Sequence, residues 1–230
     1  VIPPKDYYEK MQNVLNKYDI MFIADEVICG FGRTGNMWGS QTMKINPHSL
    51  SCAKQLSSAY LPISAVLMNE EISDLLFDQS KKIGTFGHGY TYSAHPVCAA
   101  VALRNLQLIE ERSILKNVQK VAPHFQKRLK NLKDHELIGE ARCIGLIGAL
   151  EIVADKKSKK AFDLKQLVGF QCMEFANQHG LIIRAIGDNI AFCPPLIINE
   201  EQIDNIFDRI ELALNETAVW IKKNKLRDEI

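Results

Sequence analysis

The segment Ile20–Ala24 is a short, continuously apolar run that stops at two adjacent carboxylates, Asp25 and Glu26. Continuous apolar runs of this length are typical of strands buried on both faces, as in parallel sheets. Charged groups are rarely buried unless they are paired or functional, so the two carboxylates mark the end of the strand. The glycine-punctuated segment 30–35 then predicts a turn.

The rest of the chain alternates predicted strands with predicted helices. Residues 49–53 and 62–69 resemble the first strand in composition, and helices are predicted over 5–18 and from Pro96 to 112. This alternation indicates an α/β layer rather than a β-sandwich.

The second part of the chain has a different pattern. An amphipathic helix over 114–135, strand-and-turn segments at 146–153 and 180–195, and a closing helix over 199–225 predict a small α+β domain. We therefore predict two domains, over residues 1–114 and 115–230.

Composition excludes several classes of function. The formal net charge is +1, which favours neither a nucleic-acid nor an anionic membrane partner, and no apolar run approaches the roughly 18 residues of a membrane span. The six cysteines form no C-x-x-C pair and the six histidines no ligand-like spacing, so we expect no metal site. Scattered cysteines of this kind predict reduced thiols and a cytoplasmic location.

Two strand ends carry residues capable of chemistry. Asp25 closes the first strand and Lys54 follows the second. Because ligands collect at the carboxyl ends of strands in α/β sheets, these side chains could face one crevice, where partial desolvation would free the lysine amine as a nucleophile. Pyridoxal phosphate requires such a pair, an amine for covalent attachment and an acid near its ring nitrogen. The alternative is a turn-capping aspartate and an exposed loop lysine.

Four blocks of the sequence point to one family. They are "DEVICGFGRTG", "CAKQLSSAYLPISAV", "GHGYTYSAHP" and "RAIGDNIAFCPPLII". In order and spacing they resemble the signature blocks of the class III (omega) aminotransferases, and most closely the branch that passes amino groups from omega-amino acids, diamines or amines to pyruvate. The resemblance implies part of the large domain of fold-type I transferases, a mostly parallel sheet with helices, followed by a small α+β domain in a homodimer.

The resemblance also implies roles for individual residues. Lys54 would carry pyridoxal 5'-phosphate and shuttle protons, Asp25 would pair with the pyridine nitrogen, and Val27 would pack on the ring. Thr91 would reach the cofactor phosphate of the neighbouring subunit, and Arg184 would bind the substrate carboxylate as a bidentate fork.

The chain also departs from the family pattern. Glycines are usual where this chain has Gln55, Ala59, Ser64 and Ala94, and a positive φ at any of them would cost a residue with a Cβ about 1–2 kcal/mol. The chain begins where the family is about halfway through its fold, without the phosphate loop and the ring-stacking aromatic residue. We therefore expect exposed apolar surface, weak cofactor binding and no transamination by these 230 residues alone.

Two other functions remain open. The run "IMFIADE" resembles the Mg²⁺-binding strand of P-loop ATPases, but no G-x-x-x-x-G-K-[ST] motif occurs in these residues. A catalytically impaired paralogue acting as a dimeric binding or structural protein is the second alternative. Of the other polar residues in these blocks, Glu26 and Arg33 are expected to form structural ion pairs, and His88 and His95 to order their loop.

Overall fold

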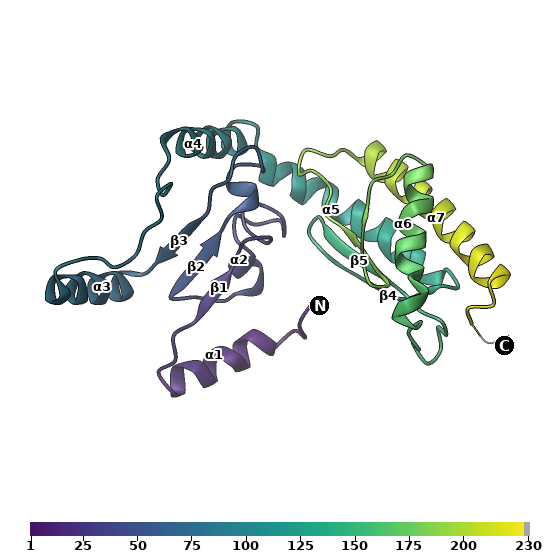
Figure 1. Cartoon of the computed structure of the whole chain (residues 1–230), viewed down its shortest axis with the longest axis horizontal. Coiled ribbons are helices and arrows are strands. Elements are labelled where there is room, and N and C mark those ends of the chain that lie inside the picture. The colour runs from purple at the N-terminus through teal and green to yellow at the C-terminus, as the bar shows by residue number, and fades with distance from the viewer. Residues whose placement is uncertain (228–230) are drawn as a thin grey trace. The chain divides into compact units, whose positions relative to one another are not determined.

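The computed structural model describes residues 1–227 and divides into two compact units (Figure 1). The N-terminal unit is Pro3–Lys116, and the C-terminal unit begins at Asn117 and also includes Val1 and Ile2. Among residues 1–227, no helix combines the length and apolar character that a bilayer span requires.

The N-terminal unit is built on a three-stranded sheet in the order β1-β2-β3, with β1 at Ile23–Asp25, β2 at Ser49–Cys52 and β3 at Ala65–Met68. β1 and β2 are parallel, whereas β3 runs antiparallel to β2. The three strands were predicted, but the expectation that β3 would be a parallel strand was wrong. A parallel return needs a long crossover, usually a helix, and the link from β2 to β3 holds only a single 3₁₀ turn.

Four helices accompany this sheet: α1 (Tyr7–Lys17), α2 (Gly39–Met43), α3 (Glu70–Ile83) and α4 (Pro96–Glu111). The sequence predicted α1 and α4 but not α3. The signals for α3 were present: the Asn69 side chain accepts a hydrogen bond from the Ile72 N–H, and Gly84 follows the helix at φ +78°.

The C-terminal unit contains a four-stranded antiparallel sheet in the order β4-β5-β7-β6. Its strands are β4 (Ile138–Ile144), β5 (Ile147–Ile152), β6 (Arg184–Ile186) and β7 (Asn189–Phe192); its helices are α5 (Ile114–Asn131), which begins just before Asn117, α6 (Val168–Gln178) and α7 (Glu200–Lys223), with 3₁₀ turns at Leu132–Asp134 and Leu164–Gln166. Alternate residues of β5 and β7 are buried, so helices cover one face of the sheet. Phe207 of α7 contacts both Phe125 of α5 and Phe192 of β7 in that core.

The two units bury their apolar residues unequally. The largest fully buried side chains all lie between Phe125 and Leu214, in the C-terminal unit. In the N-terminal unit, α1 and α3 bury no residue, and large apolar side chains of the outer strands, such as Ile23, Val66 and Leu67, are exposed. The expected exposure of apolar surface is therefore present.

Candidate functional site

Asp25 and Lys54 lie at the same edge of the N-terminal sheet. Asp25 is the last residue of β1 and pairs in register with Ser51 of the parallel strand β2. Lys54 follows β2 after Ala53 and begins the 3₁₀ turn η1 (Lys54–Leu56). Because the carboxyl ends of parallel neighbours meet at one edge, the carboxylate and the amine are brought to a common side of the sheet.

The two adjacent carboxylates have different environments. Glu26 is only 2% exposed, and its carboxylate accepts hydrogen bonds from the N–H groups of Gly39 (2.8 Å) and Ser40 (2.6 Å). Its own N–H donates to the Ser51 carbonyl and its carbonyl accepts from the Gly30 N–H. Glu26 is thus a fully bonded structural residue at the strand end.

Asp25, by contrast, is exposed and has bonding capacity to spare. Its Oδ1 accepts a hydrogen bond from the Val27 N–H at 3.0 Å, and within residues 1–227 its Oδ2 accepts none. Val27 is half-buried next to it. An anionic oxygen at this strand end is therefore free to bind a cationic group.

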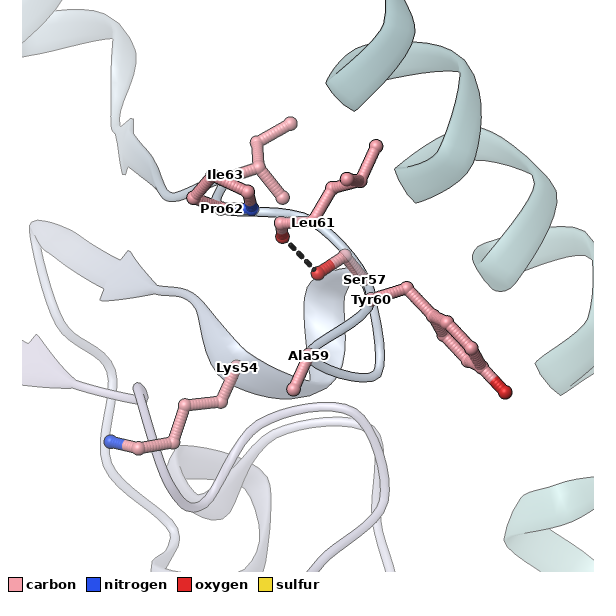
Figure 2. A pocket seen from close by; sticks show the side chains of 7 residues that line it. All are labelled: Lys54, Ser57, Ala59, Tyr60, Leu61, Pro62 and Ile63. Atoms are coloured by element: carbon pink, nitrogen blue, oxygen red, sulfur yellow. Dashed lines mark hydrogen bonds between the residues drawn. The ribbon is translucent and has the colours of Figure 1, made fainter.

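Lys54 lies beside an open pocket of about 360 Å³, whose other lining residues are Ser57, Ala59, Tyr60, Leu61, Pro62 and Ile63. Figure 2 shows the Lys54 side chain extending away from Tyr60, and the Ser57 hydroxyl donating to the Leu61 carbonyl at 2.6 Å. Lys54 is exposed, so the partial desolvation expected from its apolar flank is not found. The amine is accessible to a ligand.

The glycine replacements fall into two classes. Ala59 (φ +61°) and Ala94 (φ +55°) occupy the left-handed region that favours glycine. Gln55 and Ser64 have no positive φ, so a side chain there causes no backbone strain. The concern about missing glycines therefore applies to Ala59 and Ala94 only.

Thr91 lies in the exposed segment 84–95 between α3 and α4. Aromatic and histidine rings contact one another along this segment, from Phe86 to His88 and from His88 to Tyr90. Tyr90 and Tyr92, on either side of Thr91, are 78% and 82% exposed. The segment therefore presents a polar hydroxyl among solvent-facing rings.

Arg184 belongs to the C-terminal unit and is the first residue of β6. The pairing places it in a row across the sheet, Arg142–Ala149–Ala191–Arg184, on the face away from the buried Leu150 and Ile190. Arg142 pairs with Glu140 (3.1 Å) and donates to Asn189 (2.5 Å). Arg184 is exposed, and no residue in the described part of the chain forms an ion pair or hydrogen bond with its guanidinium. It can accept a carboxylate ligand without breaking an existing pair.

The hairpin that carries Arg184 is anchored to α6. The Asp188 carboxylate, in the turn between β6 and β7, accepts a hydrogen bond from the Gly169 N–H at 2.9 Å. Burial raises the pKa of Asp188, and the Gly169 N–H opposes this shift. A Cβ at position 169 would collide with the carbonyl oxygen of Gly187, so only glycine fits there.

The sequence of this chain is similar to those of known proteins. The family model described as aminotransferase class-III matches residues 1–214. The putrescine–pyruvate aminotransferase of Pseudomonas aeruginosa is 45% identical over 222 residues, which cover 96% of this chain and 48% of that protein. The chloroplastic gamma aminobutyrate transaminase 3 of Solanum lycopersicum is 44% identical over 228 residues, 99% of this chain and 44% of that protein.

Solved structures resemble the chain equally closely. A structure described as "Transaminase with L-ala" superposes with a TM-score of 0.93 at 50% identity, covering 96% of this chain and 52% of that one. The omega transaminase from Pseudomonas jessenii in complex with PMP has a TM-score of 0.93 at 48% identity, covering 96% and 49%. The chain spans about half the length of the proteins it matches.

Proposed function

Because the chain belongs to the class III aminotransferase family, we propose that the protein containing it transfers an amino group from an omega-amino acid, diamine or amine to pyruvate or a related 2-oxo acid. The observation that carries this proposal is the exposed carboxylate of Asp25 and the exposed amine of Lys54 at one edge of a parallel strand pair. A P-loop ATPase would use the carboxylate at the strand end but would leave Lys54, Thr91 and Arg184 without a task.

The cofactor that the family implies is pyridoxal 5'-phosphate, and the residues present fit it. When bound, it supplies an aldehyde that reacts with amines and an electron-withdrawing ring. Asp25 has an oxygen available for the ring nitrogen, and Lys54, one of the residues that line the open pocket, has an accessible amine. Val27 would contact the ring, and Thr91 would donate its hydroxyl to the phosphate of a neighbouring subunit in a homodimer.

The protein groups then have distinct tasks. Asp25 would place a carboxylate beside the ring nitrogen, where an opposite charge favours the protonated form of that nitrogen. Lys54 Nζ would remove the proton from the donor carbon that bears the amino group and, in the second half-reaction, deliver a proton to the carbonyl carbon of the acceptor. Arg184 holds a substrate carboxylate with two parallel hydrogen bonds. Its lack of a partner in the described residues supports this task.

The choice of pyruvate rests on similarity and on sequence blocks. One relative is named a putrescine–pyruvate aminotransferase, and several are named gamma aminobutyrate transaminases. The blocks "HGYTYSAHP" and "RAIGDNI" favour the pyruvate-using branch. We assign residues 1–114 to the cofactor-binding large domain and 115–230 to the small domain. The free cysteines suit a cytoplasmic location, although some relatives are named chloroplastic or mitochondrial.

The test is a panel of amines and omega-amino acids supplied with pyruvate to the full-length protein, with alanine as the readout. Lys54→Ala should abolish alanine formation, and Asp25→Asn, which removes the charge but not the shape, should lower its rate by about 10²–10⁴-fold. Lys116→Ala, a lysine outside the site, is the matched control. Alanine formation that persists in Lys54→Ala would refute the assignment.

The 230-residue chain by itself is expected to form no alanine in the same assay. Large apolar side chains lie exposed on β1, β3, α1 and α3, which supports a need for further protein around the site. Full activity from the 230 residues alone would contradict this expectation.

A catalytically impaired paralogue is the second candidate, and the strained Ala59 and Ala94 favour it. A paralogue of this kind would form no alanine with any donor, yet Lys54→Ala would leave its partner binding unchanged. The same donor panel therefore separates the two candidates.

A further inference from the structure

We propose that Asn105 of α4 is a positioning residue for Lys54. Its side chain forms hydrogen bonds to the turn that begins at Lys54 and so holds that turn in place; we call this set of hydrogen bonds the clamp. The inference deepens the proposed function and rests on it only in the last step, from a fixed turn to a correctly presented amine. The clamp itself involves only residues of the N-terminal unit.

The turn after β2 needs an external support. Lys54 (φ +42°), Ser58 (φ +49°) and Ala59 (φ +61°) all have left-handed backbone conformations without being glycine. Each such residue is disfavoured, and several in one turn persist only when surrounding structure holds them. Local bonds contribute, since the N–H groups of Ser57 and Ala59 both donate to the Lys54 carbonyl.

Asn105 supplies the long-range part of this support. Its Nδ2 donates to the carbonyl of Gln55 at 2.7 Å and to the carbonyl of Leu56 at 3.1 Å. Its Oδ1 accepts from the Ser58 hydroxyl at 2.7 Å. One amide side chain therefore bonds three of the residues that directly follow Lys54, and it uses both of its N–H donors and its acceptor.

The side chain of Gln55 completes the network. Its Nε2 donates to the Ser58 Oγ at 3.1 Å, so the hydroxyl accepts from Gln55 while it donates to Asn105. Position 55 has no positive φ, so a glycine is not required there. The glutamine that departs from the family pattern therefore contributes an additional hydrogen bond within the turn.

Asn105 is itself firmly placed on α4. Ala102 and Ile109, three residues before it and four after it, are each 5% exposed. Residues at these spacings share one face of a helix, so Asn105 projects from the buried face toward the turn. The position of α4 thereby determines the direction in which Lys54 leaves the sheet.

The test has two arms and a graded set of variants. In the first arm, amide hydrogen exchange of Ser58 and Ala59 is measured in the full-length protein, because these N–H groups donate to the Gln55 and Lys54 carbonyls. Asn105→Ala should accelerate exchange about tenfold, and Ser58→Ala, which removes fewer bonds, about threefold. Gln107→Ala, an exposed amide on the same helix, should leave exchange unchanged.

In the second arm, full-length protein stripped of cofactor is mixed with pyridoxal phosphate and reduced with borohydride at intervals. Peptide mapping compares labelling of Lys54 with that of the exposed Lys81 and Lys82. Asn105→Ala should slow the labelling of Lys54 at least fivefold and leave the two surface lysines unaffected. Asn105→Asp, which keeps the acceptor but loses both donors, should behave similarly.

Unchanged exchange in both Asn105→Ala and Ser58→Ala would overturn the clamp. Faster exchange with an unaltered Lys54 labelling rate would overturn the positioning role. An absence of Lys54 labelling in the parent protein would instead count against the proposed function, and the exchange arm would still decide the clamp.

Discussion

The backbone strain at Ala59 leads to a prediction about the sign of a stability change. At φ +61° an alanine costs about 1–2 kcal/mol relative to an unstrained conformation. Glycine removes this strain but adds about 0.5–1 kcal/mol of conformational entropy to the unfolded chain. Ala59→Gly should therefore raise the free energy of unfolding of the N-terminal unit by up to about 1.5 kcal/mol.

Ser64→Gly is the matched control. Ser64 is also small and exposed, but it has no positive φ. Replacing it with glycine adds the entropy of the unfolded chain without relieving any strain, so we expect the free energy of unfolding to fall by about 0.5–1 kcal/mol. The two glycine variants should thus shift stability in opposite directions.

The chain offers a convenient assay for this comparison. Its two tryptophans are divided between the units, Trp38 in the N-terminal one and Trp220 in the C-terminal one. In a Trp220→Phe background, urea unfolding followed by fluorescence reports the N-terminal unit, and a changed midpoint with a constant slope measures stability. If Ala59→Gly lost as much stability as Ser64→Gly, the argument from backbone strain would be wrong.

Three further predictions concern buried and half-buried polar groups. Glu26→Gln places an amide NH₂ against a backbone N–H and should lower the free energy of unfolding by about 1–3 kcal/mol, measured by urea unfolding; parental stability would contradict this. Burial lowers the pKa of His135, so the unfolded chain binds more protons and the free energy of unfolding should fall as pH drops below about 6.5. In unfolding curves recorded at about pH 7 and pH 5, His135→Asn should reduce this dependence of stability on pH. An unchanged pH dependence would refute the assignment to His135. Burial raises the pKa of the Cys172 thiol to about 11, so Cys172 should resist alkylation at about pH 8 while the exposed Cys193 reacts, as read by peptide mass spectrometry; equal rates at both thiols would contradict this.

Much of the architecture was predictable because periodic apolar patterns and helix-end residues act locally. The strands β1 and β2 and the helices α1, α4 and α7 were predicted in this way. The direction of β3 was not predicted, because an apolar pattern is the same for a parallel and an antiparallel strand. Only the connection from β2 to β3 determines which of the two forms. Helix α3 was overlooked although its cap residues stand in the sequence.

Some residues of the site could likewise be identified from the sequence, and others could not. Asp25 and Lys54 could be identified because each ends an apolar run and carries chemistry on its own. Asn105 could not, since an asparagine within a helix becomes meaningful only when the turn that it bonds is known. The family pattern raised the question of a positive φ at four positions, and only the folded backbone shows that Ala59 and Ala94 are the two that have it.

The unequal burial in the two units has a thermodynamic consequence. The largest buried apolar side chains, whose exposure on melting contributes most to the enthalpy and heat-capacity change of unfolding, are concentrated between Phe125 and Leu214. A calorimetric scan of the chain should therefore divide into a weak, broad transition from the N-terminal unit and a sharper, larger one from the C-terminal unit. Each unit then has its own melting temperature, and a single Tm would describe neither.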